Sequence, residues 1–226
     1  ASDELKESME VAGPEIFYPA TFGGKIKGFP QITNGKGTKD NSVWWIRQDW
    51  LDAVGKKVPT NYTEFVDVLK AFSKSDPDNN QKDDTYGMVT AVNEEHVNSL
   101  FFNAFGAFPY TWIDDGNGGL EYGSIQPEMK KALSELANLY ASGYIYPNAF
   151  DGNRYLGITS SVAGIMSSSH GYLPVFDPVR AANPDATFTS FRGFSFEQGK
   201  EFKLVTGQNF YRYFTVSKAC KYPEAL

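Results

Sequence analysis

The sequence predicts an α/β fold, in which helices pack against a sheet of short strands. Two segments carry apolar residues at helical spacing behind clear start signals, and short β-rich runs alternate with helical segments along the chain. This alternation is typical of α/β sandwiches. The chain has 226 residues, of which 41% are hydrophobic and 21% charged, so it is able to bury a sizeable core.

Two helices carry the strongest signals. The first is expected after Pro59, with Asn61 as its cap, Glu64 three residues later, and an apolar face formed by Phe65, Val68, Leu69 and Phe72. The second is expected from Pro127 to Gly143, with a stripe formed by Met129, Leu133, Leu136 and Tyr140. Weaker signals predict helices at 49–54 and 97–105.

Short β-rich runs supply the strands between these helices. Gly23-Gly24 predicts a hairpin within 21–30, and Asp114 to Gly119 has the composition of a turn. Strands are expected at 43–46, 86–91, 120–122, 163–166, 187–191 and 210–216.

Charge and composition exclude several classes of protein. Subtracting 27 acidic from 21 basic residues gives −6, and the basic residues are scattered, so a nucleic-acid partner is not expected. No apolar run approaches the ~20 residues that span a bilayer. The single cysteine, Cys220, excludes an internal disulfide framework and a cysteine-rich zinc site. Aromatic residues make up 15% of the chain, which suggests that some of them line a binding surface.

The most specific motif is the loop from Asp76 to Asp84, which predicts a structural calcium site. Side-chain oxygens recur at alternate positions, and calcium takes six to eight oxygen ligands. The expected ligands are the side chains of Asp76, Asp78, Asn80 and Asp84 and the backbone carbonyl of Lys82. The loop is not an EF-hand, because Gln81 and Gly87 stand where Gly and Glu are required. The alternative is a solvated turn without metal.

Several segments together resemble the family 1 extracellular solute-binding proteins of ABC transporters. These are often lipoproteins of Gram-positive bacteria that deliver oligosaccharides to ABC importers. The resemblance spans nearly the whole chain and rests on the segments Trp45 to Asp52, Gly55 to Pro59, Tyr62 to Phe72, the calcium loop with Tyr86-Gly87, Ala104 to Ala107, Pro127 to Pro147, Ala163 to Met166, and Ser217 to Leu226.

This resemblance implies a type II periplasmic-binding-protein-like fold with two α/β lobes and a sugar in the cleft between them. Residues 1–42 would end the opening segment of the first lobe, 43–205 would form the second lobe, and 206–226 would return toward the first. It further implies an extracellular, membrane-anchored lipoprotein whose anchor lies outside this chain, a monomer, and ABC permease subunits as partners. The chain would then be a partial one. Alginate-binding relatives carry an acidic residue after the last loop Asp, where this chain has Thr85.

Candidate sugar-binding residues are aromatic and polar side chains on loops at strand ends, since sugars need flat platforms and a few fixed polar groups. The candidates are Trp45, Glu94, Glu95, His96, Trp112, His170 and Tyr172. By resemblance to maltose-binding relatives, Glu94 or Glu95 would supply an acidic contact and Tyr172 a stacking ring. The alternative for each aromatic residue is ordinary packing.

No catalytic role is expected, because the common catalytic motifs are absent from the sequence. Two alternatives stay open: a carbohydrate-active enzyme that uses paired carboxylates, and a calcium-stabilised adhesion domain. The identity and charge of the sugar also stay open. The arginines, which would suit a uronate, are equally compatible with surface positions: Arg47, Arg154, Arg180, Arg192 and Arg212.

Overall fold

The computed structural model describes residues 3–32, 42–90, 95–148, 155–197, 199–205 and 210–222. The chain divides into two compact units. The larger unit spans Asn41–Leu204, and the smaller unit combines Ala1–Asp40 with Val205–Leu226. Glu94, one of the candidate sugar-binding residues, lies outside the described residues.

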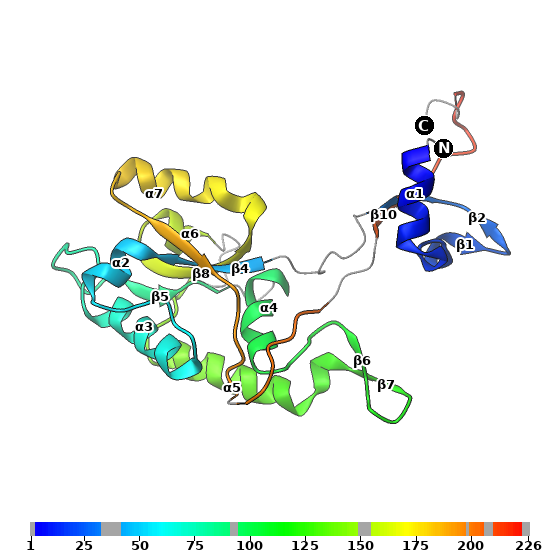
Figure 1. Ribbon diagram of the computed structural model, residues 1–226. Helices are drawn as coiled ribbons and strands as arrows, with labels where there is room; N and C mark the ends of the chain where they lie inside the picture. Colours follow the sequence, from blue (N-terminus) through cyan, green and yellow to red (C-terminus); the bar gives the residue numbers. More distant parts are fainter. Residues whose placement is uncertain are drawn as a thin grey trace. The chain divides into compact units, whose positions relative to one another are not determined.

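The larger unit is built on a four-stranded mixed sheet with the order β5-β8-β4-β9 (Figure 1). The strands are β4 (Ser42–Arg47), β5 (Tyr86–Met88), β8 (Ala163–Ser169) and β9 (Phe188–Phe191). β4 runs antiparallel to β8 and β9, whereas β5 runs parallel to β8. The α/β prediction is confirmed, and each of these strands overlaps an expected one.

Two hydrophobic clusters cover the two faces of this sheet. Successive side chains of a strand point to opposite faces. Trp44 and Ile46 of β4 therefore join the larger cluster, whereas Trp45 packs against the smaller one. The larger cluster is formed with α2 (Gln48–Ala53), α3 (Tyr62–Lys74), α4 (Glu95–Ala104) and α5 (Pro127–Ala141). The smaller cluster is formed with α6 (Leu156–Thr159), η3 (His170–Phe176) and α7 (Asp177–Ala182).

Helix α3 begins and packs as its sequence predicts. Asn61 Oδ1 accepts a hydrogen bond from Glu64 N at 3.0 Å, which caps the helix. Its predicted apolar face is buried throughout: Phe65, Val68, Leu69 and Phe72 are at most 2% exposed. Gly87 allows β5 to approach this helix closely, because a Cβ there would lie 2.8 Å from the Cα of Leu69.

Helix α5 forms where expected, but its buried face matches the predicted stripe only in part. Leu133 and Tyr140 are 49% and 45% exposed, so the predicted stripe is wrong at these two positions. The buried residues are Met129, Ala132 and Leu139, and Leu136 is partly buried against the core. The physical reason is that only one edge of α5 packs on the unit, and the small side chain of Ala132 lies at the contact instead of Leu133.

Among its described residues, the smaller unit contains an α-helix, a 3-10 helix and two small antiparallel strand pairs. Its elements are α1 (Asp3–Ala12), η1 (Pro14–Ala20), β1 (Thr21–Phe22), β2 (Lys25–Ile26), β3 (Phe29–Ile32) and β10 (Phe210–Phe214). The hairpin β1–β2 confirms the prediction, and its turn uses Gly23 and Gly24 at φ +58° and +71°. β10 pairs antiparallel with β3, so backbone pairing joins the two chain segments that make up this unit.

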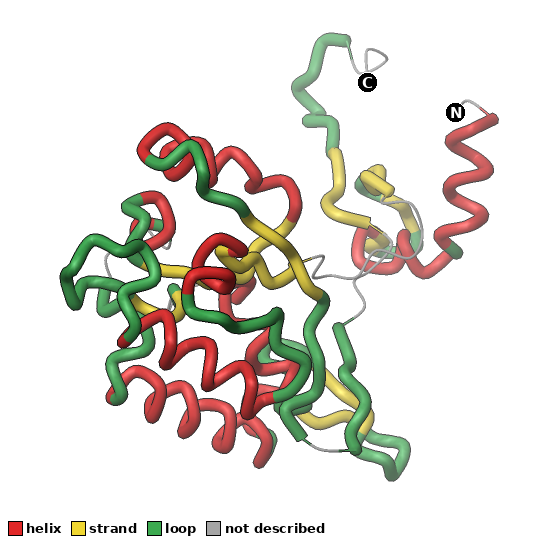
Figure 2. The backbone as a smooth tube through the Cα atoms, turned by 60° about the vertical axis from the view of Figure 1, so that its left-hand side comes forward, coloured by secondary structure: helices red, strands yellow, loops and turns green. Residues whose placement is uncertain are grey.

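A further hairpin belongs to the larger unit and separates α4 from α5 (Figure 2). It consists of β6 (Trp112–Asp114) and β7 (Leu120–Tyr122), and η2 (Gly123–Ile125) follows it. In the part of the chain that the structure describes, no helix is long and apolar enough to cross a membrane.

Candidate functional site

The predicted calcium loop connects α3 to β5 and folds around its own carboxylates. Asp76 accepts backbone hydrogen bonds with both oxygens, from Asn80 N at 3.0 Å and from Gln81 N at 2.9 Å. Three residues adopt the left-handed conformation: Asp76, Asn79 and Gln81 at φ 46°, 55° and 64°. Gln81 stands where an EF-hand has glycine, and it adopts a glycine-like conformation all the same.

The amide of Asn80 bridges two carboxylates of this loop. Its Nδ2 donates to Asp78 Oδ2 at 3.0 Å and to Asp84 Oδ1 at 3.1 Å. Its Oδ1 accepts from Lys82 N at 2.8 Å. A neutral donor therefore draws together oxygens of the kind that a hard cation would bind.

One carboxylate oxygen of Asp78 has no hydrogen-bond partner in the loop. Its Oδ1 is buried and has no hydrogen-bond partner among the described residues. Burial, the hydrogen bond with Asp76 and the charges of Asp84 and Asp76 raise the pKa of Asp78. The loop thus contains acidic oxygens, one of which is unsatisfied, and these are the kind of ligand that calcium takes. Even so, no group of three or more His, Cys, Asp or Glu within the described ranges is arranged to hold a metal.

Both ends of the loop are tied to the core. Thr85 is buried, and its hydroxyl donates to the carbonyl of Phe72 in α3 at 2.7 Å. Ser73 Oγ accepts from Gly87 N of β5 at 2.9 Å. Because Thr85 is turned toward α3, its hydroxyl does not replace the acidic ligand that the resemblance implies at this position.

Two predicted sugar-binding tryptophans have very different surroundings. Trp45 is partly buried, donates from Nε1 to the carbonyl of Ser168 at 3.2 Å, and packs edge-on against Phe176 at 5.5 Å. Trp112 is 64% exposed on β6. The nearest aromatic partner of Trp112 is Tyr122 on β7, with ring centroids 5.3 Å apart.

The other candidates are placed by their backbone alone. Glu95 and His96 begin α4, and His170 and Tyr172 lie in η3, directly after β8. Their side chains are not among those the structure describes, so their sugar-binding roles stay predictions. The structure adds Tyr155 beside the end of β8, with its hydroxyl 3.5 Å from Ser168 Oγ. No sequence signal singled out Tyr155, because it precedes the short α6 without any motif.

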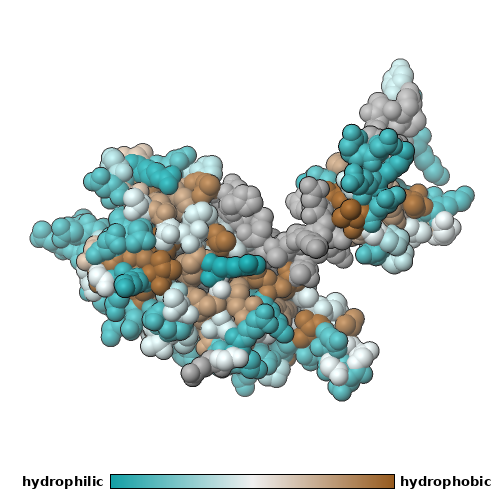
Figure 3. Space-filling view, viewed as in Figure 1, coloured by the Kyte–Doolittle hydropathy of each residue, from teal (hydrophilic) through white to brown (hydrophobic). Residues whose placement is uncertain are grey.

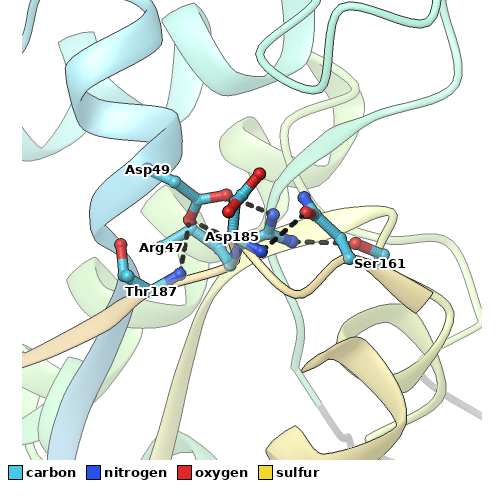
Figure 4. A network of polar contacts seen from close by, with 6 residues as sticks. Arg47, Asp49, Ser161, Asp185 and Thr187 are labelled. Atoms are coloured by element: carbon cyan, nitrogen blue, oxygen red, sulfur yellow. Dashed lines mark hydrogen bonds and ion pairs between the residues drawn. The ribbon is translucent and has the colours of Figure 1, made fainter. Parts of the chain in front are cut away.

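Arg47 lies inside the polar network drawn in Figure 4, and its side chain is not available to bind a uronate, because the residue is only 1% exposed. Its Nε and Nη2 donate to the two carboxylate oxygens of Asp49 at 2.8 and 2.5 Å, and Nη1 donates to Ser161 Oγ at 2.8 Å. The guanidinium also lies 4.8 Å from the ring centre of Trp50. Arg47 is thus a structural clamp between β4, α2 and the turn before β8.

A hollow of about 320 Å³ lies between the end of α4, the start of α5 and residues 195–203. Its charged lining alternates in sign, with Glu128, Glu197 and Glu201 beside Lys200 and Lys203. Glu197 also pairs with Lys131, and this contact lowers the pKa of Glu197. Since its charges offset one another, this hollow does not single out a class of ligand.

Comparisons of sequence identify two relatives in Bacillus subtilis, whereas no protein-family model matches. Lipoprotein LipO is 59% identical over 44 residues, which is 20% of this chain and 9% of LipO. The polygalacturonan/rhamnogalacturonan-binding protein YtcQ is 33% identical over 106 residues, which is 44% of this chain and 20% of YtcQ. These matches cover only a small part of either relative.

Comparisons of structure extend over almost the whole chain. The alginate-binding protein AlgQ2, in a structure without calcium ion, has a TM-score of 0.71 at 19% identity, covering 97% of this chain and 44% of AlgQ2. The S. pneumoniae ABC-transporter substrate-binding protein FusA, in complex with kestose, has a TM-score of 0.66 at 21% identity, covering 91% and 43%. A solute-binding protein of Bifidobacterium longum infantis that binds HMO has a TM-score of 0.71 at 16% identity, covering 98% and 49%.

The resemblance found in the sequence is therefore confirmed. These relatives and structures are named as binding proteins or as a lipoprotein, and none of them is named as an enzyme. At these identities the structural likeness shows the fold, and the chain spans less than half of each matched structure. The chain has the type II periplasmic-binding-protein-like fold of ABC-transporter solute-binding proteins.

Proposed function

We propose that this chain is part of the solute-binding component of an ABC importer and captures an oligosaccharide between two lobes. The observation that carries the proposal is the match of nearly the whole chain to two glycan-binding proteins named for ABC transporters and to an alginate-binding protein. The sequence relation to a polygalacturonan/rhamnogalacturonan-binding protein points to the same class of ligand. The partners would be the membrane-spanning permease subunits.

In this proposal the larger unit forms most of the second lobe, and the smaller unit contributes to the first. Residues 1–42 and 206–226 would carry the chain to and from the first lobe. A ligand that contacts both lobes favours the closed arrangement, because some contacts exist only when the lobes are shut. An isolated wall of the cleft would bind sugar weakly, since it supplies only part of those contacts.

Sugar contacts would come from residues that follow the strands of the larger unit. Glu94 or Glu95 would accept hydrogen bonds from hydroxyl groups, and Tyr172 would stack on a sugar face. Trp45, His96, Trp112 and His170 would complete the set of polar and aromatic contacts. Because YtcQ is named for acidic polysaccharides, both uronate-containing and neutral oligosaccharides belong in a test of the ligand.

Calcium would have a structural role in this protein. Asp76, Asp78, Asn80, Asp84 and the carbonyl of Lys82 would hold the ion in the loop between α3 and β5. The buried, unpaired Oδ1 of Asp78 supports this assignment. Bound calcium would neutralise the clustered carboxylates and hold the loop, and it would leave no open position for catalysis.

The proposed location is the extracellular face of the membrane, where a lipid anchor outside this chain would hold the protein. The sequence relation to lipoprotein LipO supports this location. A solute-binding protein at that position presents its cargo directly to the importer.

A thermal-shift and calorimetry panel tests the proposal. The panel contains oligogalacturonides, alginate oligomers, kestose and milk oligosaccharides, each incubated with the 226-residue chain. We expect at least one class to raise Tm with weak, millimolar-range affinity and without cleavage of the sugar. Hydrolysis of a panel member would favour the enzyme alternative, and the absence of binding by every member would refute the proposal.

A further inference from the structure

The hairpin β6–β7 presents two aromatic rings on one face of a two-stranded ribbon. Trp112 lies directly opposite Tyr122 in the strand register, and Asp114 lies opposite Leu120. Since side chains alternate along a strand, these four residues share one face of the ribbon. Neither ring belongs to the hydrophobic clusters of the larger unit. Figure 3 shows hydrophobic and hydrophilic residues side by side at the surface of this region.

Hydrogen bonds within the turn hold the far end of this ribbon in one shape. Asp115 Oδ1 accepts from Asn117 N at 2.8 Å and from Gly119 N at 2.9 Å, and Asp114 Oδ1 accepts from Gly116 N at 2.7 Å. The backbone also closes the turn, with Asp115 N donating to the carbonyl of Gly119 at 3.1 Å. The turn at the far end of the ribbon is therefore preorganised.

The base of the ribbon is held just as closely. Gly123 N donates to the carbonyl of Thr111 at 2.8 Å, and Tyr110 N donates to Ser124 Oγ at 2.8 Å. A Cβ at Gly123 would lie 2.0 Å from the carbonyl oxygen of Phe108, so the two backbones touch there. A ring on such a support loses little conformational freedom when it binds a ligand.

We propose that Trp112 and Tyr122 form a two-ring platform for an uncharged sugar residue of the oligosaccharide. This inference rests on the proposed function and adds Tyr122 to it as a second ring that contacts the sugar. An exposed indole offers a flat apolar face for sugar C–H groups, and the tilted Tyr122 ring, 48° to the indole plane, braces it.

The carboxylates beside the two rings favour an uncharged sugar over a uronate. Asp114 lies one position along β6 from Ile113, on the same face as Trp112, and it is exposed. Asp115 adds a second exposed carboxylate in the turn, whereas Glu121, opposite Ile113, lies on the other face of the ribbon. A uronate carboxylate placed over Trp112 would be repelled by Asp114 on the same face, whereas the hydroxyl groups of a neutral sugar would donate hydrogen bonds to that carboxylate.

Acrylamide quenching of tryptophan fluorescence tests the platform in the 226-residue chain. Trp44 and Trp50 are each 1% exposed and Trp45 is partly buried, so Trp112 is the tryptophan most accessible to the quencher. We expect millimolar kestose or maltotriose to protect the fluorescence from quenching, and trigalacturonate to protect it less. Tyr122→Ala should weaken the protection about threefold to tenfold, by loss of one ring contact.

Two further variants keep the outcome interpretable. Trp112→Phe should remove the protectable signal, and Ile125→Ala, at an 80% exposed residue outside the ring pair, should leave protection unchanged. A sugar that raises Tm without protecting Trp112 in any variant would overturn the platform and leave the proposed function standing. Stronger protection by trigalacturonate would overturn the neutral preference, and no binding of any sugar would refute both proposals.

Discussion

Two aspartate-rich loops of the larger unit have similar compositions and opposite electrostatic states. In the turn 114–119, Asp115 accepts hydrogen bonds from Asn117 N and Gly119 N, and these bonds lower the pKa of Asp115. In the loop 76–84, burial and neighbouring carboxylates raise the pKa of Asp78, and its Oδ1 has no partner among the described residues. Oxygen-rich composition alone therefore does not indicate a metal site. The feature that separates the two loops is Asp78 Oδ1, a carboxylate oxygen that has no hydrogen-bond partner among the described residues.

The largest expected effect is an increase in stability when calcium binds to the loop 76–84, since the turn 114–119 is not expected to bind it. At a free calcium concentration about 100 times Kd, binding to the folded state adds about 2.7 kcal/mol to the free energy of unfolding. For a chain of this length, that raises Tm by roughly 5–10 °C. Differential scanning calorimetry with calcium and with excess EGTA measures the effect. Identical melting curves under the two conditions would remove the calcium assignment.

Asp78→Asn should abolish that calcium response. Without metal the same variant should be slightly more stable, by about 1 kcal/mol, because a neutral amide replaces a carboxylate whose buried Oδ1 has no hydrogen-bond partner among the described residues. Asp115→Asn is the matched control in the other loop and should leave the calcium response intact. If both variants respond to calcium like the parent chain, the ion does not bind at residues 76–84.

Substitutions at left-handed backbone positions should change the free energy of unfolding by smaller amounts, with opposite signs in the two loops. Gln81 adopts φ 64°, which costs a residue with a side chain about 1 kcal/mol, so Gln81→Gly should stabilise the protein by about 0.5–1 kcal/mol. Gly116 adopts φ 75° with open space around its Cα, so Gly116→Ala should destabilise it by about 1 kcal/mol. Urea unfolding of the two variants measures both values. Destabilisation by Gln81→Gly would contradict the conformation of the loop.

Local signals predicted the helices with strong start signals and most of the strands, but they did not predict α1, α6 or α7, and they carry no information on long-range pairing. Asn61 and Pro127 mark the starts of α3 and α5 because capping and helical spacing act within a few residues. The order β5-β8-β4-β9 joins strands far apart in sequence, for which the chain carries no local signal. The exposure of Leu133 has the same origin, since the buried face of α5 depends on what packs against it.

The candidate site was predictable where chemistry repeats along the chain. Alternate oxygens identified the loop at Asp76, but the separate role of Asp78 depends on its burial, which sequence does not report. Arg47 was a plausible surface residue until the strand end placed it against Asp49 and Trp50. Tyr122 gave no sequence signal, because its position opposite Trp112 across a turn is a relation that only the strand register reveals.

The smallest expected effect is the pH dependence that Asp115 contributes. Its folded-state pKa is lowered by backbone hydrogen bonds, so it adds stability above the unfolded-state pKa of about 3.9. That contribution is lost as the pH falls from this value through the folded-state pKa. Tm measured against pH in EGTA should therefore fall less steeply in acid for Asp115→Asn than for the parent chain. For Asp78→Asn the sign reverses, because the raised pKa of Asp78 makes its protonation favour the folded state, and an equal acid slope in both variants would show that the two loops do not differ as described.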